Sequence, residues 1–582
     1  MMATTVRPSL ILLLAAVLLL ATLAPGAPAA GGQPPDLPGD LSTEEGGPWV
    51  VRAYYDDRRM VASLAAVLEP WEVHHDEGWL LAAGGPREIR ALLDLGFRLE
   101  VDAARTAELL APRVALEGQV AGIPGFPCYR TVEETYASAA ALAAAHPDLA
   151  TWIDVGDSWD KQQPGGAPGY DLWVLRLTNA QLPGPKPKLF VLASIHAREY
   201  APAELATRFA EHLVGSYGLD ADVTWLLDHH EIHLMLQGNP DGRKMAEAGD
   251  LWRKNTDSDD GCTNPAVWGV DLNRNFGFAW DCCGGSSDYP CSETYHGPGP
   301  ASEPETVAVQ DYLRAEFPDQ RLPGLDAPAP ADATGVFVDL HSYGDLVLWP
   351  WGFDDTVAPN GTALQTLGRK MAYWNGAIPE QAWYLYRYPT DGTTDDFAYG
   401  DLGLAAFTFE VGTEFFEECG RFEGTILPGN LPALLYAAKV ARTPYQAPAG
   451  PDVRDLALLP EVVGVDATIQ VRATLDDTRY STLGGNEPTQ NIAEGELYVD
   501  LPPWVQGATP AAQPLLPLDG AFDASVEEVW ASLSTAGLEP GRHVLYLRGR
   551  DAEGHWGAFS AHFLYVIGHQ AYLPVVRQQQ TP

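Results

Sequence analysis

Short apolar runs recur through the middle of the chain, and they have the length and composition of buried β-strands. Helical patterns separate them. This alternation predicts an α/β domain at residues 120–445, with a mostly parallel or mixed sheet covered by helices. The clearest strands are 189–195, 231–237, 336–341 and 406–410, and the clearest helices are 203–217 and 303–317, the second with Ser302 as its expected N-cap.

Residues 48–102, before this domain, have the pattern of a smaller α+β unit that follows a Gly- and Pro-rich linker. The order of its elements, βαββαβ, is that of a ferredoxin-like fold. The expected strands are 49–55, 71–75, 79–83 and 97–101, and the expected helices are 58–68 and 87–95.

After residues 446–451 the pattern changes to strict alternation of apolar and polar positions, as in 467–473 and 543–548. Turn signals separate these runs, and the pattern predicts an all-β sandwich at residues 452–568. It resembles an immunoglobulin-like or fibronectin-III-like module. A polar tail, 569–582, follows.

Residues 1–29 predict a cleaved secretory signal peptide. Arg7 precedes the apolar stretch 10–23, and small residues follow at Ala27-Pro28-Ala29. The stretch is shorter than the roughly 20 residues of a comfortable membrane span. We therefore expect a secreted protein without a transmembrane anchor. The six cysteines, an even number, fit an oxidising compartment and disulfide bonds whose pairing the sequence leaves open.

The chain is strongly acidic, with 78 Asp and Glu against 36 Lys and Arg and a formal net charge of −42. Binding to nucleic acid requires clustered basic residues, so this class of partner is excluded. An acidic surface is compatible with basic substrates, but solubility alone also explains it.

Three of the apolar strands deliver chemically useful residues near their carboxyl ends. His196 and Glu199 follow the strand at 189–195, His341 ends a second strand, and Glu410 ends a third. In open α/β sheets the binding crevice lies at these strand ends. Two histidines and one carboxylate form a catalytic type of zinc site, and a separate carboxylate could serve as a general base. The sequence therefore predicts a zinc hydrolase.

At this point the chain resembles the zinc metallocarboxypeptidases of the carboxypeptidase A/B type. The resemblance covers roughly residues 120–445 and implies a mixed sheet of the eight-stranded type flanked by helices. The motifs that carry it, in the family order, are His196-Ala197-Arg198-Glu199, Asn239-Pro240-Asp241-Gly242, Trp252-Arg253-Lys254, Asp271-Leu272-Asn273-Arg274-Asn275, Cys291-Ser292-Glu293-Thr294-Tyr295, His341-Ser342-Tyr343 and Phe407-Thr408-Phe409-Glu410.

The resemblance implies a role for each site residue and peptide or protein C-termini as substrates. His196, Glu199 and His341 would bind Zn²⁺, and Glu410 would be the general base. Arg253 would stabilise the oxyanion. The remaining residues would bind substrate: Asn273 and Arg274 the terminal carboxylate, Tyr388 as a mobile cover, and Arg198 and Tyr343 in neighbouring subsites.

The identity of the released residue depends on one further position. In the register that places Tyr388 twenty-two residues before Glu410, the specificity residue is Asp395. An acidic side chain at the base of the pocket would favour C-terminal Lys or Arg. The alternatives are that Asp395 is a loop or capping residue, or that a slip of one residue puts Asp396 there.

The flanking units carry further expectations. Residues 48–102 resemble the prosegments that cap this family's active site, which implies a zymogen cleaved between about residues 102 and 123, with Arg105 and Arg113 as candidate cut sites. The loop 257–261 is a weak calcium candidate. The cluster His229-His230-Glu231-Ile232-His233 lacks the helical zinc spacing and is expected to be structural. The alternative for the whole chain is a catalytically inactive surface or matrix binding protein on the same fold.

Overall fold

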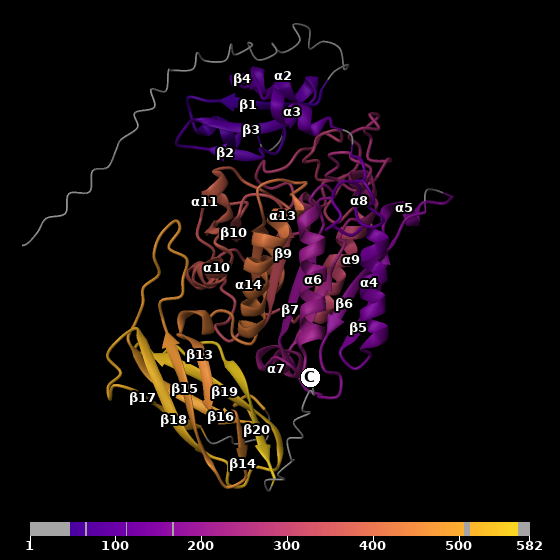
Figure 1. Ribbon diagram of the computed structural model, residues 1–582. Coiled ribbons are helices and arrows are strands. Elements are labelled where there is room, and N and C mark those ends of the chain that lie inside the picture. The colour runs from indigo at the N-terminus through magenta and orange to yellow at the C-terminus, as the bar shows by residue number, and fades with distance from the viewer. Residues whose placement is uncertain (1–46, 65–66, 112, 166–167, 506–511, 569–582) are drawn as a thin grey trace, which may run out of the picture.

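A computed structural model describes residues 47–568 except 65–66, 112, 166–167 and 506–511. The predicted signal peptide and the tail 569–582 lie outside the described residues. The chain forms three sheet-containing units in a row, with the smallest at one end of the central unit and an all-β unit at the other (Figure 1). No helix in the described ranges is long and apolar enough to cross a membrane.

The first unit is an antiparallel four-stranded sheet with strand order β2-β3-β1-β4 and the predicted order of elements. Its first helix is shorter than the expected 58–68: it ends at Ala62, and turns follow. The elements are β1 (Trp49–Tyr54), α1 (Arg59–Ala62), β2 (Glu72–His74), β3 (Trp79–Gly84), α2 (Pro86–Asp94) and β4 (Arg98–Val101), followed by α3 (Ala103–Leu109).

The central unit is a mixed eight-stranded sheet with order β11-β10-β12-β9-β7-β8-β6-β5. Strands β12, β9, β7 and β8 run parallel, so their carboxyl ends lie at one edge of the sheet. The strands are β5 (Ala150–Asp157), β6 (Asp171–Leu177), β7 (Lys188–Ala193), β8 (Glu231–Met235), β9 (Val336–His341), β10 (Leu346–Trp349), β11 (Ile378–Gln381) and β12 (Ala405–Glu410). The mixed α/β sheet that the pattern predicted is thus confirmed.

Helices cover this sheet and complete its core. Helices α6 and α14 contact β7 and β9, and α12 contacts β9 and β12. The helices are α4 (Val132–Ala145), α5 (Trp159–Gln162), α6 (Tyr200–Ser216), α7 (Ala221–His229), α8 (Pro240–Glu247), α9 (Pro304–Glu316), α10 (Gly361–Asn375), α11 (Ala382–Tyr386), α12 (Thr394–Leu402), α13 (Cys419–Arg421) and α14 (Leu427–Val440). Short helical turns are η1 (Leu272–Arg274), η2 (Phe422–Ile426) and η3 (Ala447–Ala449).

The predicted N-cap of α9 is wrong by one residue. Glu303, not Ser302, precedes the first helical residue. The Ser302 hydroxyl instead donates to Glu303 Oε1 at 2.8 Å, while the Glu303 backbone N–H donates to the Asn275 side chain at 3.2 Å. A tertiary contact therefore decides where this helix begins.

The third unit has eight strands in the order β13-β15-β18-β17-β16-β19-β20-β14. Its alternating apolar side chains form a separate core that includes Val471, Leu497, Val529 and Leu547. The strands are β13 (Asp452–Leu459), β14 (Val462–Gly464), β15 (Thr468–Asp476), β16 (Ile492–Val499), β17 (Gln513–Pro517), β18 (Val526–Ser534), β19 (Gly541–Asp551) and β20 (Ser560–Ile567). The unit is all-β, as the alternation indicated.

All six cysteines are paired. The disulfides are Cys128–Cys419, Cys262–Cys291 and Cys282–Cys283. The first joins the beginning and the end of the central unit across a sequence separation of 291 residues.

Candidate active site

The three predicted strand ends meet at one edge of the central sheet. His196 and Glu199 lie in the loop between β7 and α6, and His341 is the last residue of β9. Glu410, the last residue of β12, is paired in register with His341. Because these strands are parallel neighbours, residues separated by up to 214 positions in sequence come together.

The two histidines and Glu199 form a compact group of ligand atoms. Nδ1 of His341 lies 3.0 Å from Nδ1 of His196. The Glu199 carboxylate lies 2.8 Å from Nδ1 of His196 and 3.2 Å from Nδ1 of His341. All three side chains are buried. Although burial raises the pKa of Glu199, the two imidazoles beside it hold that pKa well below its usual range. Convergent imidazole nitrogens and a carboxylate are the donor set that zinc prefers, so this group fits a zinc site.

A buried aspartate lies within hydrogen-bond distance of the other ring nitrogen, Nε2, of each histidine. The Nε2 atom of His196 lies 3.1 Å from Asp271 Oδ1, and that of His341 lies 2.8 Å from Asp339 Oδ2. Both aspartates have no exposed surface. Metal-binding histidines are commonly oriented by such carboxylates.

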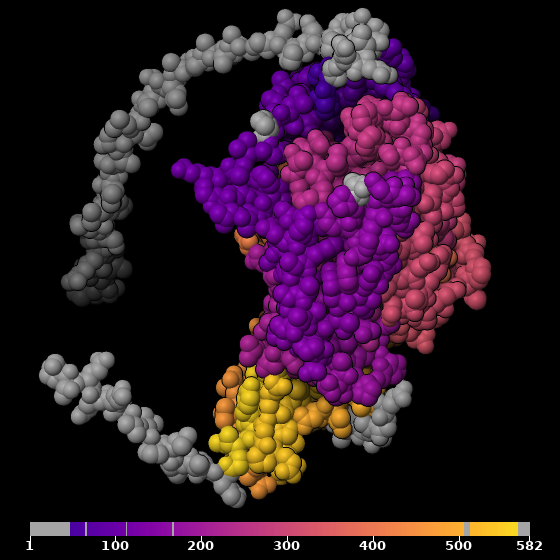
Figure 2. Space-filling view, turned by 90° about the vertical axis from the view of Figure 1, so that its right-hand side faces the viewer, coloured from indigo at the N-terminus to yellow at the C-terminus, as the bar shows by residue number. Residues whose placement is uncertain are grey.

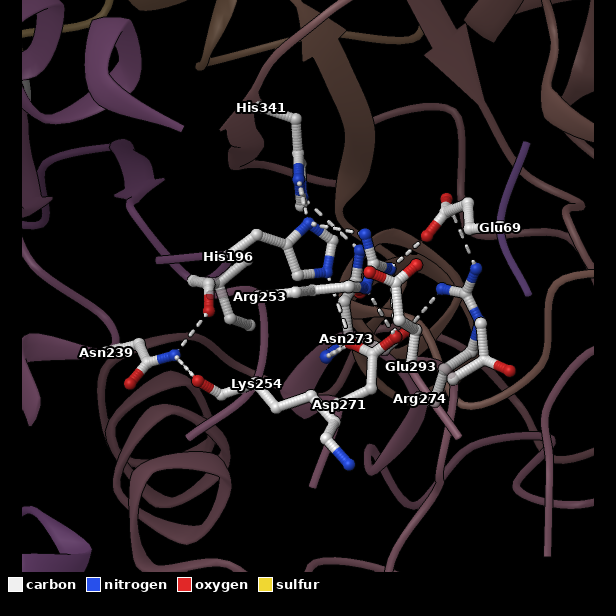
Figure 3. Close-up of polar contacts among 12 residues, drawn as sticks. Glu69, His196, Asn239, Arg253, Lys254, Asp271, Asn273, Arg274, Glu293 and His341 are labelled. Atoms are coloured by element: carbon white, nitrogen blue, oxygen red, sulfur yellow. Dashed lines mark hydrogen bonds and ion pairs between the residues drawn. The ribbon is translucent and has the colours of Figure 1, made fainter. Parts of the chain in front are cut away.

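Two arginines place positive charge beside this group. The guanidinium of Arg253 donates to Asp271 Oδ2 from Nε at 3.0 Å and from Nη2 at 2.8 Å. Arg274 donates to the backbone carbonyls of Gly285 and Asn273. The carboxylate of Glu69, from the N-terminal unit, makes ion pairs with both arginines, and Figure 3 shows it facing their guanidinium groups.

The site opens into a cavity of about 830 Å³. One wall comes from the N-terminal unit, residues 69–77, and another from the central unit, including His196, Arg253 and Glu410. Burial raises the pKa of Glu410 to about 8; the nearby Glu199 and Glu69 add to this increase and His341 opposes it. A bound cation or the loss of Glu69 would act in the opposite direction.

The predicted subsite residues Arg198 and Tyr343 also line the cavity. Arg198 is buried, donates to Glu293 at 2.8 Å, and lies over the ring of Phe415 at 4.2 Å. The ring of Tyr343 packs edge-on against the same phenylalanine. The two side chains thus share one wall.

Asn273, Tyr388 and Asp395 lie deeper. The Asn273 side-chain oxygen accepts the backbone N–H of Thr394, at the start of α12. Tyr388 is buried against the core of the N-terminal unit, with its ring 5.4 Å from that of Tyr386. Asp395 is buried beside Asp396, and none of the three borders the 830 Å³ cavity. Asp396 accepts the backbone N–H groups of Gly352 and Phe353.

Sequence reasoning missed Glu69, Asp339 and the role of Asp271. Glu69 has no local signal, because its partners lie in a different unit. Asp339 did have one: a charged residue within an apolar strand, two positions before a histidine on the same face.

The loop 257–261 and the cluster around His233 were the two other candidates for binding a cation. In the loop 257–261, Asp257 accepts the N–H of Asp259, and Asp260 accepts those of Cys262 and Gly269, so these carboxylates stabilise the loop. Nothing here supports calcium. His233 does approach Glu231 and Glu316.

In the group formed by Glu231, His233 and Glu316, Lys188 already supplies a positive charge where a metal ion would have to bind. Its ammonium donates to Glu316 at 2.6 Å and lies 3.7 Å from Glu231. The expectation that this cluster is structural stays a prediction.

Comparison with known proteins identifies the family. The family model for zinc carboxypeptidases matches residues 135–424. A zinc carboxypeptidase of Saccharothrix mutabilis subsp. capreolus is 31% identical over 350 residues, which is 57% of this chain and 74% of that protein. Rat (Rattus norvegicus) carboxypeptidase A2 is 30% identical over 301 residues, 49% of this chain and 63% of that protein.

Solved structures show the same fold at lower identity. Carboxypeptidase A from Helicoverpa armigera has a TM-score of 0.53 and 21% identity, covering 69% of this chain and 97% of that chain. Thrombin activatable fibrinolysis inhibitor has a TM-score of 0.52 and 21% identity, covering 68% of this chain and 98% of that chain. The likeness to these structures concerns the fold. The relative that is 31% identical and covered over 74% of its length, together with the matching family model, shows that the chain belongs to the zinc carboxypeptidase family.

Proposed function

We propose that the protein is a secreted zinc-dependent carboxypeptidase that removes the C-terminal residue of peptides and proteins. The observation that carries this proposal is the convergence of His196, Glu199 and His341 on one point, with two arginines beside it. An inactive relative would usually lack some of these residues, and here all are present.

His196, Glu199 and His341 would hold the zinc. When bound, zinc supplies Lewis acidity, which polarises a carbonyl and acidifies water. Glu410 borders the cavity beside this group, so its carboxylate takes the proton of the attacking water and passes it to the leaving amine. Arg253 is buried and held by Asp271, so its charge is preorganised for an oxyanion.

The carboxyl terminus of the substrate has a matching partner in Arg274. A guanidinium group binds a carboxylate through two parallel hydrogen bonds. The contact with Glu69 supports this role, because a side-chain carboxylate already lies against both arginines. Asn273 binds the same group, and Tyr388 covers it when the substrate is present.

The same contact supports an inhibitory role for residues 48–102. In the uncleaved chain Glu69 forms an ion pair with Arg274, the residue that would bind the substrate carboxylate. Residues 69–77 close one side of the cavity. We therefore propose a zymogen, with cleavage between about residues 102 and 123. Arg105 is paired with Glu72 and Glu414, which favours the exposed stretch around Val114 and Val120 over Arg105 as the cleavage region.

We propose a preference for basic C-terminal residues because Asp395 is a buried carboxylate that directly follows Thr394, whose backbone N–H donates to Asn273. The all-β unit at residues 452–568 is proposed to be an immunoglobulin-like or fibronectin-III-like module. Its fold alone assigns it no activity.

The first test is metal removal combined with one substitution. Hydrolysis of a peptide by the cleaved protein should disappear with a zinc chelator and return with added Zn²⁺. Glu410→Gln should reduce kcat/KM by at least about 100-fold, because the general base is lost. Zinc content should remain at one per chain. Activity that survives both changes would exclude the proposed chemistry.

A further inference from the structure

Asp339 is a charged residue in the middle of the sheet. Every residue of β9 is buried, and Asp339 lies two positions before His341 on the same face of the strand. Burying a carboxylate costs several kcal/mol unless specific partners compensate for it. Such a residue in a central strand therefore calls for an explanation from its contacts.

The first contact selects the tautomer of His341. Asp339 Oδ2 lies 2.8 Å from Nε2 of that imidazole, and a carboxylate can only accept a hydrogen bond. The proton of neutral His341 is then on Nε2, which leaves the lone pair of Nδ1 directed at the group formed with His196 and Glu199. Asn273 Nδ2 is 3.3 Å from the same Nε2 atom and could donate only to the other tautomer. The nearer charged partner prevails.

The second contact connects β9 to α12. Thr394 Oγ1 donates to Asp339 Oδ2 at 2.6 Å. The backbone N–H of Thr394 donates to Asn273 Oδ1 at 2.9 Å. One carboxylate oxygen thus binds a candidate zinc ligand and the first residue of the helix that carries Asp395.

The arrangement mirrors the one on the other histidine. Asp271 holds His196 from Nε2 and also holds Arg253. Asp339 holds His341 from Nε2 and also holds Thr394. Figure 3 shows both imidazoles and Asp271 converging on the same region.

We propose that Asp339 is a positioning residue that fixes the tautomer and ring orientation of His341 for zinc and fastens this ligand to the N-terminus of α12. It touches neither substrate nor metal. The inference rests on the zinc site of the proposed function, but not on peptide hydrolysis.

The test measures zinc affinity by competition with a chelator, without substrate. Asp339→Asn, which keeps the size of the side chain, should weaken zinc binding by about 10-fold to 100-fold, as is usual when such a supporting carboxylate is lost. Asp271→Asn provides a benchmark of the same kind. Asp345→Asn is the matched control, because Asp345 lies just after β9 and pairs with Arg421. The zinc affinity of this variant should stay within about twofold of that of the parent protein.

A purely structural role makes a different prediction. Asp339→Asn would then lower the melting temperature of the metal-free protein but leave its zinc dissociation constant unchanged, and this result would overturn the proposal. Thr394→Val removes only the connection to α12, so it should raise KM for peptides while zinc affinity changes less than in Asp339→Asn.

If Asp339→Asn does not fold, the tautomer can be measured in the unsubstituted protein. Long-range ¹H–¹⁵N NMR of ¹⁵N-histidine-labelled, metal-free protein, with His341→Gln for assignment, should show Nε2 protonated. Protonation of Nδ1 with Nε2 unprotonated would overturn the proposal. A loss of zinc affinity in Asp339→Asn with no peptide hydrolysis in the parent would instead contradict the proposed function and leave this inference standing.

Discussion

At the scale of single residues, charge placement defines the candidate site. Asp271 contacts both His196 and Arg253. Its burial raises its pKa, but the charge of Arg253 and the hydrogen bond with His196 hold that pKa well below the usual range. The carboxylate therefore stays ionised at neutral pH and keeps both partners in place. Asp395 and Asp396, by contrast, are buried carboxyls whose pKa values burial raises.

Substitution of Asp395 separates the two registers that the sequence allowed. With Asp395 as the specificity residue, the parent should release C-terminal Arg faster than C-terminal Phe. Asp395→Asn should reduce kcat/KM for the Arg peptide by at least about 10-fold, because a shielded charge pair is lost, and leave the Phe peptide within about threefold.

Asp396→Asn is the matched control for this experiment. Asp396 holds the backbone of Gly352 and Phe353, so its loss should affect both peptides equally. A parent that prefers Phe, or an Asp396→Asn variant that loses only the Arg peptide, would remove Asp395 from the role.

At the scale of elements, side-chain caps define where helices begin. Helix α4 begins with a capping box: Thr131 accepts the N–H of Glu134 at 3.2 Å, and the Glu134 carboxylate accepts the N–H of Thr131 at 3.0 Å. Glu134 also accepts the N–H of Gly122, which ties the helix to the preceding loop. One cap therefore fixes both the start of the helix and the entry of the chain into the central unit.

Removal of this cap should have a measurable cost. Thr131→Ala should lower the free energy of unfolding by about 1 kcal/mol, whereas Thr131→Ser, which keeps the hydroxyl, should lose less than half of that. Chemical denaturation of both variants beside the parent checks this. Equal losses for Ala and Ser would show that packing of the methyl group, rather than the cap, is responsible.

The sequence predicted the elements with strong periodicity and the residues at strand ends, because a parallel strand delivers its last residue to a fixed edge. His341 and Glu410 are the last residues of their strands for that reason, and His196 lies in the loop that follows β7. The sequence failed where contacts between distant segments decide. Ser302 is not the N-cap of α9, because its hydroxyl accepts a hydrogen bond from Asn275. Glu69 contacts Arg253 and Arg274 from another unit. No local pattern encodes such contacts.

At the scale of the whole molecule, the N-terminal and all-β units lie at opposite ends of the central unit (Figure 2). The N-terminal unit covers the cavity, and the buried ring of Tyr388 packs into its core. The all-β unit is fastened far from the site, by ion pairs that include Lys370 with Asp452 and Arg369 with Glu487. The first unit can therefore leave without disturbing the third.

Loss of the Glu69 charge should make the uncleaved chain less inhibited. Glu69→Gln removes the ion pairs with Arg253 and Arg274. It should raise the activity of the uncleaved protein at least about 10-fold, since breaking a buried charge contact costs about 2 kcal/mol or more. Peptide release before and after removal of residues 48–102 measures this.

Glu77→Gln is the control, because Glu77 lines the same cavity but its carboxylate accepts a hydrogen bond from Trp79 Nε1 instead of pairing with an arginine. It should leave the uncleaved protein inhibited. Uncleaved parent as active as the cleaved form would show that the N-terminal unit is not an inhibitor.

The most direct measurement compares two versions of one peptide, with a free C-terminal carboxylate and with a C-terminal amide, using cleaved, zinc-loaded protein and mass spectrometry of the products. We expect stepwise release of single residues from the free acid and a rate at least about 100-fold lower for the amide, because Arg274 and Asn273 lose their charged partner. Equal hydrolysis of both peptides, or cleavage at internal bonds, would contradict it.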